Sequence, residues 1–277
     1  MPEPLGTLES LWRYPVKSML GEETPEADVA GQGIDGDRRW ALIDRATGRV
    51  ASAKNPRLWR SLLTMSAAAD GTAARIVLPG GEVVRSTDTG ADAVLSRLLG
   101  RPVALTDVPP EGATLERAVP DEVLAAGVTA EVAVEEGAVG AAAPGRFVDF
   151  APVHLIGTAT LDAIGAASPR GRVEAARYRP NLIVRTAGPG YQENGWVGRD
   201  LAVGDEVVLR GMAPTPRCAI PTLEHGDLPR DTAALRVPAR DNRVEPLPGF
   251  GERPCAGLYA QVVRTGRVRR GDTVRLL

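Results

Sequence analysis

Residues 258–276 read LYAQVVRTGRVRRGDTVRL, in which apolar runs are interrupted by turn signals at Thr265-Gly266 and Gly271-Asp272. This alternation predicts a closing pair of β-strands, 258–263 and from Val268 onward, joined by a turn. The pattern G-D-x-V-x-L at 271–276 also occurs at 204–209, where a turn again delivers the chain into a strand. The recurrence predicts a barrel-like sheet.

Short elements joined by turns are expected elsewhere, because the 277 residues include 31 glycines and 23 prolines. Helices are predicted at 88–100, which has a capping residue and a terminal glycine, and from an N-cap at Thr158 to about Ala167. The stretch 107–145 lacks a period and is predicted to be a surface excursion. Strands are predicted at 40–44 with 49–52, at 76–78 with 82–84, and at 181–185. The predicted fold class is therefore β-rich α+β.

The composition is that of a globular protein, with 43% hydrophobic and 25% charged residues. A formal charge of −2 gives no electrostatic case for nucleic acid or an anionic membrane surface. We expect no signal peptide at residues 1–4 and no membrane-spanning helix. Two cysteines cannot form a disulfide framework or an on-chain four-cysteine iron–sulfur cluster. The expected location is the cytoplasm.

Cys218 lies in the proline-stiffened loop APTPRCAIPT. The three prolines fix φ around the thiol, which is therefore held in position. The adjacent Arg217 favours the thiolate, which is the form that attacks electrophiles or binds metals. From these residues alone, Cys218 is a metal ligand, a persulfide carrier, a nucleophile or a buried small apolar residue.

Lysine occurs only at Lys17 and Lys54 among the 33 lysine and arginine residues. We interpret Lys54 as a chance survivor. Lys17 precedes Ser18 and follows a rigid proline, a setting in which a compact ammonium suits a phosphate or a tight pocket. Further anion-binding donors are expected at Arg38 (at a strand start), Thr158 (at a helix N-terminus), Arg179 and Asn181. Together with a poised thiolate, they suggest a phosphorylated heterocyclic ligand that also offers a soft metal.

Other common sites find no support in the sequence. The two histidines, without CxxC or HExxH, argue against a closed zinc site, and His154 is interpreted as structural within an apolar run. There is no GxGxxG after a strand and no GxxxxGK[ST], so no direct case exists for a dinucleotide or a nucleoside triphosphate.

Several separate motifs resemble those of the MOSC family, named for the C-terminal domain of molybdenum cofactor sulfurases, and within it the mitochondrial amidoxime-reducing component branch. LWRYPVKS at 11–18 and GDRRWAL at 36–42 resemble the N-terminal β-barrel segment. Arg179-Pro180-Asn181, Arg217-Cys218 and the segment 257–272 resemble the MOSC domain proper. The resemblance implies a MOSC β-barrel core at 111–277. It also implies an N-terminal β-barrel-like domain at 1–110, whose first strands carry Lys17 and Arg38 to the cofactor site.

The resemblance also implies a molybdenum–molybdopterin cofactor with Cys218 as the sulfur ligand of the metal, a sensible role for a soft thiolate. Residue by residue, Lys17, Ser18 and Arg38 match positions on the phosphate side of the pterin. The positions around the pterin and the metal are matched by Thr158, Arg179, Asn181, Arg217 and Tyr259.

The implied function is reduction of small N-hydroxylated, or related N-oxide or S-oxide, substrates. The electrons are expected from a separate flavin, haem or ferredoxin type of protein, since no cysteine-rich segment follows residue 277. The loop 223–231 is more charged than expected for these reductases and is predicted to line the substrate mouth. Two alternatives stay open: a sulfur carrier that uses a Cys218 persulfide, and a non-catalytic protein that binds or delivers the cofactor.

Overall fold

Seven strands close into a barrel in the computed structural model, which describes residues 3–277. Their order around the barrel is β12-β13-β1-β19-β14-β15-β17, and pairing of β17 with β12 completes the ring. These strands are β1 (Glu3–Arg13), β12 (Val153–Gly157), β13 (Leu182–Thr186), β14 (Asp200–Val203), β15 (Val207–Pro216), β17 (Arg253–Arg264) and β19 (Thr273–Leu276). The predicted β-rich α+β fold with a barrel core is confirmed.

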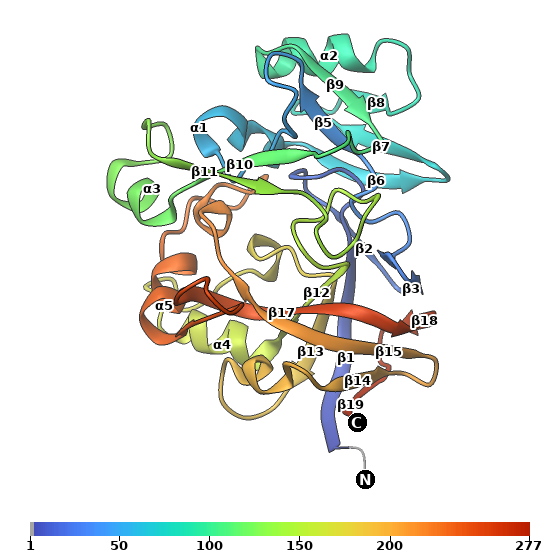
Figure 1. Cartoon of the computed structure of the whole chain (residues 1–277), viewed down its shortest axis with the longest axis vertical. Helices are drawn as coiled ribbons and strands as arrows, with labels where there is room; N and C mark the ends of the chain where they lie inside the picture. Colours follow the sequence, from blue (N-terminus) through green and yellow to red (C-terminus); the bar gives the residue numbers. More distant parts are fainter. Residues whose placement is uncertain (1–2) are drawn as a thin grey trace.

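The first strand of the chain is an integral part of this barrel. β1 pairs antiparallel with β13 on one side and with β19 on the other, so that Glu3 lies opposite Leu276. Figure 1 accordingly shows the start of β1 and the end of β19 at the same end of the molecule. The one parallel pair of the ring, β12 with β13, is joined through helix α4 (Thr158–Ala166), as a parallel connection requires a crossover. Alternate side chains of these strands fill the barrel with a core that includes Leu8, Leu11, Leu155, Leu209 and Leu258.

A second hydrophobic core lies between residues 16 and 103, above the barrel in Figure 1. It is built from a three-stranded sheet, a two-stranded pair and short helices, and it buries Met19, Trp59, Leu62 and Leu95. The elements here are β5 (Ala41–Asp44), α1 (Pro56–Trp59), η1 (Arg60–Thr64), β6 (Ser66–Asp70), β7 (Ala73–Val77), β8 (Val83–Arg85), α2 (Ala91–Leu99) and β9 (Val103–Thr106).

The remaining elements surround these two cores. The hairpin β10–β11 and helix α3 come from the stretch predicted to be a surface excursion, and every residue of β11 is exposed. The bounds are β2 (Glu22–Thr24), β3 (Glu26–Ala30), β4 (Gly33–Ile34), β10 (Thr114–Ala118), α3 (Pro120–Ala126), β11 (Val134–Ala138), η2 (Ala175–Arg177), η3 (Gln192–Trp196), η4 (Ile220–Thr222), α5 (Ala233–Asp241), β16 (Arg243–Val244) and β18 (Gly266–Arg269). Met1 and Pro2, part of the segment where no signal peptide is expected, lie outside the described residues. No helix between residues 3 and 277 is long and apolar enough to cross a bilayer.

The prediction that strand 258–263 pairs with the strand from Val268 onward is wrong. β18 pairs with β3, and β19 pairs with β1 and β14, whereas β17 pairs with β12, β15 and β16. The apolar alternation locates each strand correctly. It does not indicate which distant strand each of them pairs with. The predicted hairpin at 76–84 is confirmed as β7–β8. At 40–52 the chain turns back as predicted, but the main partner of β5 is β9.

Two helices begin at other residues than predicted, and two site residues predicted to lie on strands do not lie there. Helix α2 begins at Ala91 after Gly90, and α4 begins with Thr158 itself, so its N-cap is Gly157. Lys17 and Arg38 lie in turns and not on strands. Arg38 has φ of 43°, a left-handed conformation that a strand cannot accommodate.

Candidate functional site

A pocket lined by cations lies between the barrel and the N-terminal core. Its empty volume is about 690 Å3, open mouth included. The N-terminal core contributes turns, and the barrel contributes the segments that enter and leave its strands. We name it the cationic pocket, and its lining includes Lys17, Ser18, Arg38, Ser52, Lys54, Asp149, His154, Tyr178, Arg179, Asn181, Arg217, Cys218 and Tyr259. The structure thus brings together eight of the nine residues predicted for the site.

The backbone is strained at this pocket. Among the described residues, only four non-glycine residues have positive φ, and three of them line it: Ser18 at 64°, Arg38 at 43° and Arg179 at 55°. Each such conformation costs on the order of 1 kcal/mol and persists only where the surroundings enforce it. Strain gathered at one cavity indicates that its side chains are positioned for a ligand.

One carboxylate holds both lysines of the chain. Lys17 Nζ lies 2.7 Å from Asp149 Oδ1 and also donates to the carbonyl of Phe147 at 2.8 Å. Lys54 Nζ lies 2.9 Å from Asp149 Oδ2. Burial would raise the pKa of Asp149, but the two lysines outweigh it and hold that pKa well below its ordinary value. The chance-survivor interpretation of Lys54 is therefore wrong, because both lysines are buried in this pocket.

The lysines themselves are poorly solvated. Burial lowers the pKa of Lys17, although Asp149 opposes the shift. Burial, together with the charge of Arg117, lowers the pKa of Lys54 to about 8. Lys54 is therefore a cation whose charge is lost at mildly alkaline pH.

Two arginines are fixed around a buried tyrosine. The guanidinium carbons of Arg38 and Arg179 lie 4.5 Å and 4.4 Å from the centre of the Tyr14 ring, as cation–π pairs. Arg38 Nη1 pairs with Asp37 at 2.6 Å, and its Nη2 donates to the carbonyl of Arg179 at 3.0 Å. Arg179 Nη1 donates to the carbonyl of Met19 at 2.6 Å. These bonds join the N-terminal core to the barrel across the pocket.

Within residues 3–277, Arg179 has no carboxylate partner of its own. Burial and the neighbouring charge of Arg38 lower the pKa of Arg179 to about 10. A bound anion would relieve this charge, so the arrangement favours an anionic ligand.

Cys218 is 7% exposed and follows Arg217 at the end of β15. Arg217 Nη2 donates to the carbonyl of Tyr178 at 3.0 Å, while its buried Nε has no hydrogen-bond partner among the described residues. His154 lies in the same wall, and burial, with the charge of Arg217, holds its pKa well below the ordinary value. The histidine is thus a neutral neighbour of the thiol loop.

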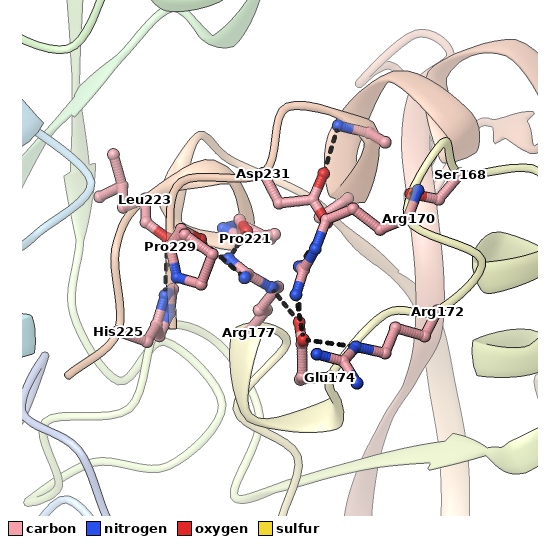
Figure 2. A network of polar contacts seen from close by, with 12 residues as sticks. Ser168, Arg170, Arg172, Glu174, Arg177, Pro221, Leu223, His225, Pro229 and Asp231 are labelled. Atoms are coloured by element: carbon pink, nitrogen blue, oxygen red, sulfur yellow. Dashed lines mark hydrogen bonds and ion pairs between the residues drawn. The ribbon is translucent and has the colours of Figure 1, made fainter. Parts of the chain in front are cut away.

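The side chain of Arg177, which is fully buried, holds the loop that follows Cys218 through hydrogen bonds (Figure 2). Arg177 donates to the carbonyls of Leu223 at 3.1 Å and Pro229 at 2.7 Å, and it pairs with Glu174 at 2.6 Å. Residues 223–231, which were predicted to line the substrate mouth, do not line the cationic pocket. Instead, the amide of Gly226 donates to Leu63 in the N-terminal core.

Thr158 lies outside the pocket, at the opposite end of β12 from His154. Its hydroxyl accepts a hydrogen bond from the amide of Thr186 at 3.1 Å, so it ties helix α4 to β13. Asn181 does line the pocket, but its amide bridges strands by accepting from the His154 backbone and donating to the carbonyl of Trp12. Spacing along the sequence could not distinguish these roles.

Asp149, which binds both lysines, was not among the residues predicted for the site. Asp149 stands in the run FVDF, between apolar residues, and an isolated carboxylate in such a run is the signal that could have identified it. No group of three or more His, Cys, Asp or Glu side chains suited to a metal ion occurs within residues 3–277.

Comparisons with known proteins agree with this architecture. The family model of the MOSC domain matches residues 143–275, and that of the MOSC N-terminal beta barrel domain matches residues 5–96. The chain is 25% identical to mitochondrial amidoxime-reducing component 1 of Mus musculus, over 99% of this chain and 83% of that protein. Identity to the human component 1 is 24%, over 99% and 84%.

A crystal structure of the YuaD protein from Bacillus subtilis is also similar, with a TM-score of 0.42 and 11% identity over 100% of this chain and 98% of that one. The two family models together describe a protein with a MOSC N-terminal beta barrel domain followed by a MOSC domain. The chain belongs to the MOSC family.

Proposed function

We propose that this protein binds a molybdenum–molybdopterin cofactor in the cationic pocket and reduces small N-hydroxylated compounds. The relatives named amidoxime-reducing components support this proposal, because they align with nearly the whole chain. The single observation that carries it is the placement of the buried thiol of Cys218 among five cations around one cavity.

The residues present fit such a group. Lys17, Lys54, Arg38, Arg179 and Arg217 face a single lining carboxylate, Asp149, so the pocket has an excess of positive charge for a phosphorylated ligand. The buried Nε of Arg217 is a donor without a partner among the described residues, and it is available to a polar heterocycle. The thiol is the soft ligand that molybdenum would take from the protein.

Each side of the pocket has its own role in the proposal. Lys17, Ser18 and Arg38 would hold the phosphate, and Arg179, Arg217, Asn181 and Tyr259 would surround the pterin and the metal. Thr158 has no place in this set, because its hydroxyl is bound to β13. When bound, the cofactor supplies the oxygen-accepting, two-electron redox chemistry.

The overall reaction consumes two electrons and two protons, breaks the N–O bond of the substrate, and releases the amine or amidine and water. Lys54 Nζ is the pocket group best suited to hold a proton for this step, since its pKa of about 8 is close to neutral pH. Asp149 positions that ammonium through the 2.9 Å ion pair. The electrons would come from a separate flavin, haem or ferredoxin type of protein, in the cytoplasm.

Metal analysis of protein made in a host that builds the cofactor tests this proposal. We expect about one molybdenum per chain in the wild type and its loss in Cys218→Ser, while Cys255→Ser retains it. The loaded wild type should also reduce an amidoxime or hydroxylamine with an artificial reductant. Molybdenum-free protein with sulfane sulfur on Cys218 would favour the sulfur carrier instead. Bound cofactor without turnover of any such compound would favour a delivery role.

A further inference from the structure

A second cavity adjoins the cationic pocket. Asp149, Pro216 and Tyr259 line both, so the two spaces share a wall. The second cavity has an empty volume of about 990 Å3, open mouth included, and it lies between the hairpin β10–β11 and the loop 245–251. We name it the vestibule.

The vestibule differs from the cationic pocket in its chemistry. Phe150, Leu247 and Phe250 give it an apolar lining, together with Pro246. Its charged residues are Arg117, Glu135 and Glu136 of the hairpin β10–β11 and the shared Asp149. Glu136 already pairs with Arg49 at 2.6 Å, and Asp149 pairs with both lysines. Because these carboxylates have cationic partners, the apolar side chains dominate what the vestibule offers, and they suit an uncharged apolar group.

Phe250 is 52% exposed, which is unusual for a large aromatic side chain. Its loop is nonetheless ordered, because the carboxylate of Glu245 accepts hydrogen bonds from the amides of Gly249 at 2.9 Å and Gly251 at 3.3 Å. The amide of Phe250 donates to the carbonyl of Leu247 at 3.0 Å. The loop thus holds two apolar side chains at the vestibule despite their contact with solvent.

On this basis we propose that the vestibule binds the apolar body of the substrate, while the N-hydroxylated group reaches past Tyr259 to the thiol side. This inference rests on the proposed reductase function and adds a substrate class to it, namely N-hydroxylated compounds with an aryl or branched alkyl body. Phe250 and Leu247 determine the specificity, and Glu245 is a positioning residue for them.

A matched pair of substrates tests the inference in the cofactor-loaded protein. N-hydroxybenzamidine and N-hydroxyacetamidine carry the same reducible group and differ only in a phenyl or a methyl body. With an artificial reductant, we expect kcat/KM to be about 10- to 100-fold higher for the phenyl compound, mainly through a lower KM, because a phenyl ring is removed from water. Equal values for the two compounds would overturn the inference while leaving the reductase function intact.

Single-residue variants test whether the vestibule causes the preference for the phenyl compound. Phe250→Ala and Glu245→Ala should lower the ratio of the two kcat/KM values by about fivefold or more. Glu245→Gln should retain the ratio, because an amide oxygen still accepts from both glycines. Val263→Ala, which removes an exposed apolar side chain of β17 outside the vestibule, should leave the ratio unchanged. A ratio that falls as much in Val263→Ala as in Phe250→Ala would contradict the assignment.

A binding measurement separates the two proposals if no substrate is reduced. Benzamide, which is uncharged and has no N–O bond to be reduced, should show saturation transfer from cofactor-free wild type to its ring protons in NMR, and this transfer should be reduced in Phe250→Ala. Transfer without turnover would reject the reductase function but keep the vestibule as an aryl site. Absence of transfer in the wild type would reject the vestibule.

Discussion

Asp149 Oδ2 lies 2.9 Å from Lys54 Nζ, and the second oxygen of the same carboxylate lies 2.7 Å from Lys17 Nζ. Two buried ammonium groups thus share one negative charge in the wall of the pocket. The shared carboxylate leaves an excess of positive charge that can bind an anionic ligand. Asp149 is also the residue that holds both lysines in position.

Replacement of Asp149 by asparagine should lower the free energy of unfolding by about 3 kcal/mol, because two buried cations lose the carboxylate with which both are paired. The control is Asp200→Asn, which breaks a 2.7 Å pair with Arg210 on the surface. That variant should lose at most about 1 kcal/mol. Urea unfolding of the cofactor-free proteins provides the measurement, and equal losses in the two variants would show that burial of the lysines is unimportant.

Anion binding to the cofactor-free pocket should weaken as the pH rises through about 8. Lys54 is charged below its lowered pKa and neutral above it, so the pocket loses one positive charge in this range. Titration calorimetry with sulfate, whose charge is constant here, should show several-fold weaker binding at pH 9 than at pH 7. Lys54→Arg should flatten this profile, since a guanidinium stays charged. A profile that is the same in both proteins would assign the effect to another group.

Removal of the Arg177 clamp should loosen the loop that follows the thiol. In Arg177→Met, the carbonyls of Leu223 and Pro229 lose their buried donor, and stability should fall by about 3 kcal/mol. Hydrogen exchange of residues 221–229 should accelerate. Arg172→Ala, which removes an exposed partner of the same Glu174, should leave both measurements almost unchanged. Unchanged exchange in Arg177→Met would mean that the loop is held by its other contacts.

Cys255 should resist alkylation in the folded protein. It is fully buried, and burial raises the pKa of its thiol to about 12. Iodoacetamide at pH 8 followed by peptide mass spectrometry should find Cys255 unmodified until denaturant is added. Rapid modification under native conditions would contradict its placement under strand β16.

Gly257 should not tolerate a side chain. Its φ is 84°, and a Cβ there would lie 2.6 Å from His154 Nε2 and from the carbonyl oxygen of Leu155. Gly257→Ala should therefore cost about 3 kcal/mol or more, through strain and overlap. Gly48→Ala has a similar φ of 73° but open space around it, and it should cost only about 1 kcal/mol. Thermal unfolding of the two variants compares these costs.

The sequence identified the pocket better than it identified the connections of the fold. Lys17, Arg38, Arg179 and Arg217 could be predicted because their chemistry is visible in short motifs, and the fold does bring them together. The ladders of β18 and β19 could not be predicted, since β18 pairs with β3 and β19 with β1, both more than two hundred residues away, and β19 also pairs with the distant β14.

The errors at Lys54 and Thr158 have a common cause. Lys54 lacks a motif, and only the approach of Asp149 from a distant segment shows its role. Thr158 has the residue type and helix position of an anion site, but its hydroxyl is bound to the neighbouring strand. Local sequence describes what a side chain can do, whereas tertiary contacts decide which atoms are still free to do it.

The position of β1 between β13 and β19 constrains how the protein can be made. During translation, the first strand leaves the ribosome long before the last, and its partner β19 ends at Leu276. The barrel therefore cannot close until β19 has been synthesised, whereas the core at residues 16–103 can assemble earlier. A nascent chain that lacks β19 would leave the edges of β1 and β14 unpaired, and such edges can pair with other chains.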